Sequence, residues 1–180
     1  MPIINTGFRE KYAHESYSNS YDHGFWEDKD NRNKDEMVML IINELSECQE
    51  AIRSNRIGIY DFDTYNENTN GPFDIWYKEN VKGCIGEELA DCIIRIFDFV
   101  TGWGLGHHDC VSTFSSKGNF SADLLQLVKI VISDSESNLW HHSIHAIIEF
   151  ANTWNIKLES HIVYKQRYNR SRPYKHGKLF

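Results

Sequence analysis

Residues 39–52 read MLIINELSECQEAI, an apolar helical pattern that contains two glutamates. At about 100° per residue, one face of a helix through this stretch collects apolar side chains: Met37, Ile41, Leu45, Cys48 and Ile52. Glu44 falls inside that face, and Glu47 lies at its edge one turn later. Burying an unpaired carboxylate costs several kcal/mol, so the pattern predicts that a cation neutralises Glu44.

A second stretch, residues 83–100 (GCIGEELADCIIRIFDFV), repeats the arrangement. Glu88 and Asp91 lie three residues apart at the border of its apolar face, and Arg95 continues their row. Such acidic pairs are common on solvated helix faces, where they have no special role. If the two helices pack antiparallel, however, four carboxylates meet, and they need cations to share a partly buried site. Oxygen ligands alone favour Mg²⁺ or Mn²⁺.

The remaining pattern predicts an all-α protein of a single domain. Helices are expected at about 33–54, 84–101, 121–133, 136–154 and 157–170. Asn33 and Glu36 resemble a capping box at the first of these helices. Residues 1–32 are polar and aromatic with weak periodicity, and we interpret them as loop or short helices. Insertions or variable loops are expected at about 57–82 and 105–120.

Composition excludes several classes of protein. The net charge of −7 argues against a general nucleic-acid surface. No apolar run is long enough to span a bilayer, and the first residues lack the features of a signal peptide. The four cysteines form no CxxC pair and are interpreted as reduced thiols, so a cytoplasmic location is expected, with no membrane partner.

The charge is unevenly distributed, because residues 165–178 (KQRYNRSRPYKHGK) hold six of the 19 Lys/Arg and no Asp or Glu. Lys165, Asn169 and Arg172 follow one another at i, i+4 and i+7, which places them on one face of the last helix and its exit. Arg and Lys both bind phosphate. This row is therefore a candidate polyphosphate contact, although a nonspecific basic terminus would have the same composition.

Taken together, these motifs resemble the MazG-like all-α nucleoside triphosphate pyrophosphatases. The resemblance rests on Phe25-Trp26, INELSECQEAIRS, EELADCIIRIFDFVTGWG and YNRSRPYKHGK, in that order. It covers roughly residues 22–56, 83–104 and the last twenty or so. It implies a helical bundle with the active site between antiparallel helices, completed by a homodimer or homotetramer.

The resemblance also implies an activity and roles for individual residues. The activity is Mg²⁺-dependent cleavage of a nucleoside triphosphate, as a housecleaning reaction on dNTPs, to a monophosphate and pyrophosphate. The implied metal ligands are Glu44, Glu47, Glu88 and Asp91, and the implied phosphate contacts are Lys165, Asn169 and Arg172. Trp26 would stack on or wall the base pocket, and Arg95 would contact phosphate or act as a counter-charge. Glu47 is our candidate general base, because it lies nearer the open site than Glu44.

Three other classes of protein share parts of this pattern. A di-iron bundle normally needs Glu-x-x-His on two helices, and none is present. Gly106-His107-His108-Asp109 resembles part of a His-Asp phosphohydrolase, but it lies in a predicted loop. The third alternative is a non-catalytic helical protein that binds metal or nucleotide as a sensor or partner module. Turnover with pyrophosphate release would distinguish the enzyme from that module.

Overall fold

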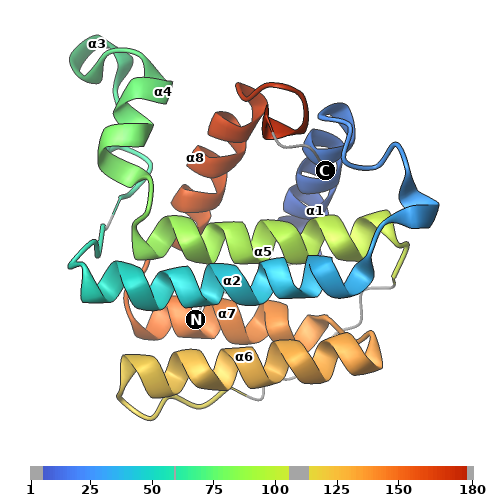
Figure 1. Cartoon of the computed structure of the whole chain (residues 1–180). Coiled ribbons are helices and arrows are strands. Elements are labelled where there is room, and N and C mark those ends of the chain that lie inside the picture. The colour runs from blue at the N-terminus through green and yellow to red at the C-terminus, as the bar shows by residue number, and fades with distance from the viewer. Residues whose placement is uncertain (1–5, 59, 106–113, 178–180) are drawn as a thin grey trace.

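The computed structural model describes residues 6–58, 60–105 and 114–177, and this part of the chain is helical without any strand (Figure 1). The prediction of an all-α fold is confirmed. The elements in chain order are α1 (Thr6–Asp22), η1 (Lys29–Asn31), α2 (Lys34–Arg53), α3 (Glu67–Asn70), α4 (Phe73–Trp76), the π-helical turn η2 (Tyr77–Val81), α5 (Ile85–Gly102), α6 (Phe120–Ser137), α7 (His141–Thr153), α8 (Leu158–Arg170) and η3 (Tyr174–Gly177).

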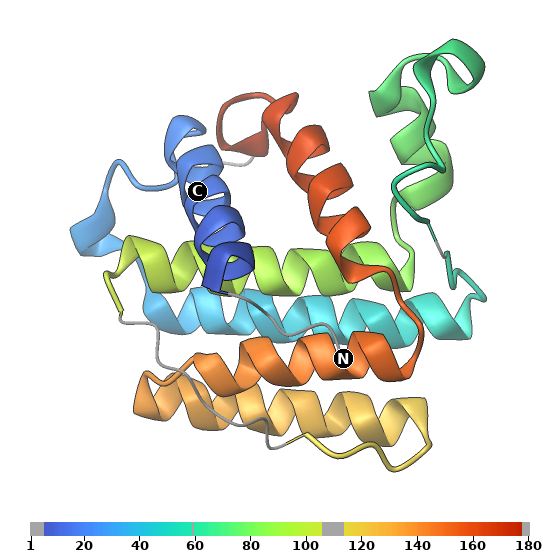
Figure 2. The ribbon, with the colours of Figure 1, turned by 180° about the vertical axis from the view of Figure 1, so that it is seen from behind.

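The helices form two layers around an antiparallel pair, α2 and α5 (Figure 1). On one side, α6 and α7 run alongside this pair. On the other side, α1 and α8 are inclined and stand on α5, as the view from behind also shows (Figure 2). The segment that holds α3 and α4 projects at one end of the pair. The two helices that carry the acidic pairs therefore lie side by side, as the sequence predicted.

Helix α5 is the centre of the fold, since every residue in it except Asp91, Arg95 and Thr101 is buried. Its apolar side chains contribute to the main core together with those of α2, α6, α7 and α8. The wide apolar faces of α2 and α5 are covered by helices of the same chain. These contacts within one chain do not test the expected dimer or tetramer, which stays a prediction.

Helix α2 begins as predicted, with Asn33 as its N-cap. The Asn33 side chain accepts hydrogen bonds from the backbone N–H groups of Asp35 and Glu36, at 2.9 and 3.3 Å. These bonds satisfy two amides that have no partner within the helix. The start of α2 is thereby fixed, and with it the direction in which Glu44 projects.

The N-terminal helix α1 was not predicted as a long helix, and the interpretation of residues 1–32 as loop or short helices was wrong there. Its buried face consists of Arg9, Tyr12, Ala13 and Ser16, which have helical spacing but little hydrophobicity. Hydrogen bonds replace apolar burial on this face: Tyr12 donates to Glu159 at 2.9 Å, and Gln166 donates to Ser16 at 3.1 Å. Packing on α5 and α8 therefore stabilises a helix that periodicity cannot detect.

The boundary between α6 and α7 also differs from the prediction, because α6 continues to Ser137 and α7 begins only at His141. Helix α6 ends at Asn138, which adopts a left-handed conformation with φ of 56°. The buried Asp134 accepts hydrogen bonds from the backbone N–H and the hydroxyl of Ser143, at 2.7 and 2.8 Å. Asp134 of α6 thus caps the start of α7. Sequence signals for helix ends do not reveal a cap that comes from another helix.

The region predicted as an insertion at 57–82 folds into short helices with an aromatic cluster of their own. Tyr77 stacks on Tyr168 of α8, with ring centroids 4.5 Å apart. Part of the second predicted insertion, including Gly106–Asp109 and Cys110, lies outside the described residues. The three described cysteines, Cys48, Cys84 and Cys92, are unpaired and buried, as predicted. Among the described residues no helix has the length and hydrophobicity needed to cross a membrane.

Gly86 allows α8 to approach α5 closely. A Cβ atom at this position would lie 2.3 Å from Nε2 of the fully buried His161. Lys165 follows His161 by one helical turn and reaches two carboxylates of α5. The contact between a glycine and a histidine ring therefore sets the position of Lys165.

We expect Gly86→Ala to lower the free energy of unfolding by about 1–3 kcal/mol, because the new methyl group overpacks the contact with His161. This loss should occur although Ala is intrinsically better than Gly in a helix by about 1 kcal/mol. Chemical denaturation of the four members of a double-mutant cycle with His161→Ala measures the effect. In the His161→Ala background the same change should be neutral or stabilising. An equal loss in both backgrounds would contradict the proposed contact.

Candidate functional site

Three of the four predicted carboxylates converge where α2 and α5 pack together. One oxygen each from Glu44, Glu88 and Asp91 lies within 4.8 Å of the others. Glu44 and Glu88 are buried, and Asp91 is half-buried. The donors are all carboxylate oxygens, which suits a hard divalent cation such as Mg²⁺ or Mn²⁺.

Two cationic side chains already face this cluster. Arg95 donates to Glu44 at 2.6 Å. Of the two roles expected for Arg95, phosphate contact and counter-charge, it has the second in this structure. Lys165 lies 2.5 Å from a carboxylate oxygen of Asp91 and 2.5 Å from one of Glu87. No salt bridge reaches Glu88 from the described residues. Glu44, Glu87, Glu88 and Asp91 thus share the positive charges of Arg95 and Lys165. A divalent cation would balance the negative charge that remains.

The local electrostatics agree with this charge deficit. Burial, with the nearby Asp91, raises the pKa of Glu44 to about 7, against the opposing effect of Arg95. Burial and the carboxylates of Glu87 and Asp91 raise the pKa of Glu88 to about 9. Both carboxyl groups are therefore costly to ionise without an added cation.

Glu47, the fourth predicted ligand and the candidate base, does not belong to the group of three. Its side chain is exposed, and Asn43 donates a hydrogen bond to it at 2.5 Å. It nevertheless lines a smaller cavity of about 320 Å³ together with Glu88 and Asp91. Glu47 therefore lies beside the cluster, on its open side.

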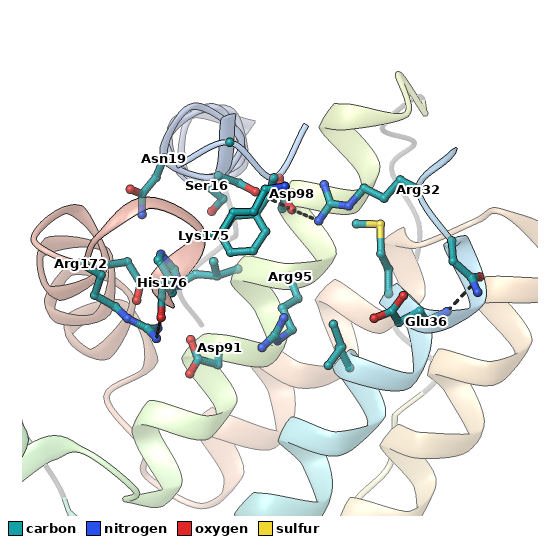
Figure 3. A pocket seen from close by; sticks show the side chains of 18 of the residues that line it. Ser16, Asn19, Arg32, Glu36, Asp91, Arg95, Asp98, Arg172, Lys175 and His176 are labelled. Carbon is teal, nitrogen blue, oxygen red and sulfur yellow. Dashed lines mark hydrogen bonds and ion pairs between the residues drawn. The ribbon is translucent and has the colours of Figure 1, made fainter. Parts of the chain in front are cut away.

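A larger cavity of about 430 Å³ lies against the cluster, between α2, α5, α1 and the C-terminal segment (Figure 3). Met37, Leu40 and Ile94 supply apolar wall, together with the ring of Phe25. Charged side chains surround this apolar part: Arg32, Glu36, Asp91, Arg95, Asp98, Lys165, Arg172 and Lys175. A concave site with both apolar and charged walls is typical of small-molecule binding.

The C-terminal residues predicted to contact phosphate lie at one end of this cavity. Lys165 and Asn169 are buried on α8, and Arg172 follows at its exit. The Oδ1 atom of Asn169 is buried and has no hydrogen-bond partner within the described residues. Arg172 donates to the carbonyl of His176 at 3.5 Å, and Figure 3 shows the guanidinium of Arg172 near Asp91. The structure therefore brings the predicted row together beside the acidic cluster.

Trp26, in contrast, is part of the core rather than a wall of the cavity. It is only 4% exposed, and its indole N–H donates to Asp98 at 2.7 Å. A Cβ atom at Gly102 would lie 2.1 Å from the indole ring, and the guanidinium carbon of Arg32 lies over the ring, 4.0 Å from its centroid. The predicted contact between Trp26 and a base is therefore not available in this arrangement, and Phe25 takes the place on the wall.

Two site residues were missed in the sequence analysis. Glu87 is buried, pairs with Lys165 and accepts a hydrogen bond from Tyr77 at 2.9 Å. Asp98 is buried at the cavity and accepts hydrogen bonds from Trp26, Ser20 and Arg32. Burial raises the pKa of Asp98 to about 6, although Arg32 opposes the shift. The position of Asp98 inside the apolar run IFDFV gave the same signal as Glu44 and could have revealed it.

Comparisons of the chain with known protein families, with curated proteins and with solved structures found no match. The function is therefore inferred from the residues of the site.

We expect Trp26→Phe to lower the free energy of unfolding by about 1–3 kcal/mol more than Trp103→Phe, as measured by chemical denaturation. The two substitutions remove the same atoms from two neighbouring tryptophans. The Trp26 indole donates to the buried Asp98 carboxylate, whereas the Trp103 indole nitrogen has no partner within the described residues. Equal losses in the two variants would show that the bond to Asp98 contributes nothing.

Proposed function

We propose that this chain is a divalent-metal-dependent nucleoside triphosphate pyrophosphohydrolase. The observation that carries the proposal is the convergence of Glu44, Glu88 and Asp91 within 4.8 Å, beside a cavity that Lys165 and Arg172 line. A carboxylate site that can bind Mg²⁺ next to phosphate-binding side chains is the combination that phosphoryl transfer requires. The resemblance of the two acidic helices and the basic tail to MazG-like pyrophosphatases supports the same activity.

The large cavity accommodates the nucleoside in this proposal. Met37, Leu40, Ile94 and Phe25 offer an apolar wall for a base, and Asn169 offers an unpartnered oxygen. Arg172 lies near Asp91 at the cluster end, where it would face the α-phosphate (Figure 3). A dNTP is our default substrate, in a reaction that clears unwanted nucleotides.

In the proposed reaction a water oxygen bonds to the α-phosphorus. The bond from that phosphorus to the bridging oxygen breaks, and the bridging oxygen leaves with pyrophosphate. Mg²⁺ held by Glu44, Glu88 and Asp91 would supply positive charge to the phosphate oxygens. Glu47, exposed on the open side of the cluster, would accept the proton of the water while Asn43 holds its carboxylate. Lys165 would neutralise Asp91 and the reacting phosphates in turn.

The proposal is tested by pyrophosphate release from a panel of dNTPs, NTPs and modified nucleotides, with Mg²⁺ and with EDTA. We expect metal-dependent release that falls about 100-fold or more in Asp91→Asn, because the variant loses a metal ligand. Glu50→Gln is the matched control, since Glu50 is exposed on α2 and its side chain pairs, among the described residues, only with Arg53 and Ser54. It should keep the wild-type rate.

The same assay tests the role of Glu47. Glu47→Gln should lower turnover while Mg²⁺ binding is kept, and near-normal turnover would remove Glu47 as the base. Absence of release from every nucleotide, in a folded protein that binds Mg²⁺, would contradict the enzyme. That result would favour the sensor or partner module instead.

A further inference from the structure

The smaller cavity next to the carboxylate cluster is lined by four cationic and four acidic side chains. We call it the cationic pocket and define it by Arg56, Lys78, Lys82 and Lys165, which line it together with Glu47, Glu87, Glu88 and Asp91. Arg56, Lys78 and Lys82 come from the segment between α2 and α5, which the resemblance to a known family does not account for beyond residue 56. Within the part of the chain that is described, none of these three side chains forms a salt bridge with a carboxylate.

Arg56 is held in place by the ends of the two central helices. Its backbone N–H donates to Ala51 at 2.8 Å, and its carbonyl accepts from Ile85 at 3.1 Å. Its guanidinium donates to the carbonyl of Lys82, and it covers Gly83, where a Cβ atom would lie 3.1 Å from Nη1. Gly83 has φ of 77°, a conformation that favours glycine. The backbone is therefore shaped so that the guanidinium lies across the start of α5.

Lys78 and Lys82 extend this positive edge. Lys78 lies on the π-helical turn η2, with its ammonium 5.9 Å from the ring centroid of Tyr168. Lys82 is the residue that ends this turn. Both side chains are exposed, so their charges are available to an anion. The aromatic cluster of the inserted segment packs the turn η2 against α8. Both lysines thereby line the cationic pocket beside the carboxylate cluster.

The two cavities adjoin, because the ion pair of Asp91 and Lys165 lines both of them. The large cavity is lined by residues of the N-terminal end of α2 (33–40) and of α5 (91–98). The cationic pocket is lined instead by Glu47, Arg56 and residues of the segment 83–91. Since α2 and α5 run antiparallel (Figure 1), the two cavities follow one another along the pair and meet at Asp91.

We propose that the cationic pocket binds the β- and γ-phosphates of the substrate and holds the pyrophosphate after cleavage. This inference rests on the proposed function, which places the nucleoside and the α-phosphate in the large cavity. Arg56, Lys78 and Lys82 stabilise the negative charge that develops on the leaving pyrophosphate as the bridging bond breaks. The inserted segment therefore selects triphosphates over diphosphates, because a diphosphate leaves the far end of the pocket without an anion.

Calorimetric titration with pyrophosphate in the presence of Mg²⁺ tests the pocket directly, beside steady-state kinetics with a nucleoside triphosphate and its diphosphate. We expect Lys78→Ala, Lys82→Ala and Arg56→Ala each to weaken pyrophosphate binding by roughly 10- to 100-fold, the range for a lost charge-assisted hydrogen bond. The preference for triphosphate over diphosphate should fall in parallel. Lys129→Ala is the matched control, because Lys129 is an exposed lysine of α6 and lines neither cavity.

The outcomes separate this inference from the proposed function. Nucleotide hydrolysis with pyrophosphate binding that is unchanged in all three variants would overturn the pocket assignment while the enzyme stands. Pyrophosphate binding that depends on the three cations, in a protein that hydrolyses no nucleotide, would support the pocket and overturn the proposed hydrolase. Failure of the wild type to bind pyrophosphate with Mg²⁺ present would overturn the pocket assignment. Lys78 and Lys82 make no side-chain hydrogen bond within the described residues, so their variants should fold even if Arg56→Ala does not.

Discussion

The structure depends on how buried carboxylates on α2 and α5 are neutralised. Glu44 and Glu88 are excluded from solvent by the same packing that builds the core, and Arg95 and Lys165 supply only part of the compensating charge. Replacing these carboxylates with apolar groups would be expected to favour stability. Their presence on the central helix pair therefore supports the proposal that the site binds a cation.

Helix α5 connects the fold to the chemistry. Its apolar side joins the core, while its acidic side faces both cavities. Gly86 lets α8 approach, so Lys165 reaches Asp91, and Gly102 lets Trp26 reach Asp98. Two glycines of α5 thus position Lys165 at one end of the site and the hydrogen-bonded carboxylate of Asp98 at the other. A change in the packing of α5 would alter core and site together.

The sequence predicted the parts of this arrangement that follow from helical periodicity. The two acidic helices, the all-α class and the convergence of Glu44, Glu88 and Asp91 could be derived from an apolar face interrupted by charge. Helix α1 could not, because it is buried through hydrogen bonds of Tyr12 and Ser16 rather than through hydrophobic area. The structural role of Trp26 and the cations of residues 56–82 depend on contacts between distant segments, which have no local signal.

Calorimetric titration with Mn²⁺ and with Mg²⁺ tests the central claim most directly, using the wild type, Glu88→Gln and the exposed-site control Glu50→Gln. Glu88 is the carboxylate of the cluster that no salt bridge from the described residues reaches, so its loss should act on a bound metal ion rather than on an ion pair. We predict saturable binding in the wild type and in Glu50→Gln, and a loss of about 10-fold or more in affinity in Glu88→Gln. Absence of saturable binding in the wild type, or equal affinity in all three proteins, would contradict a metal site between α2 and α5.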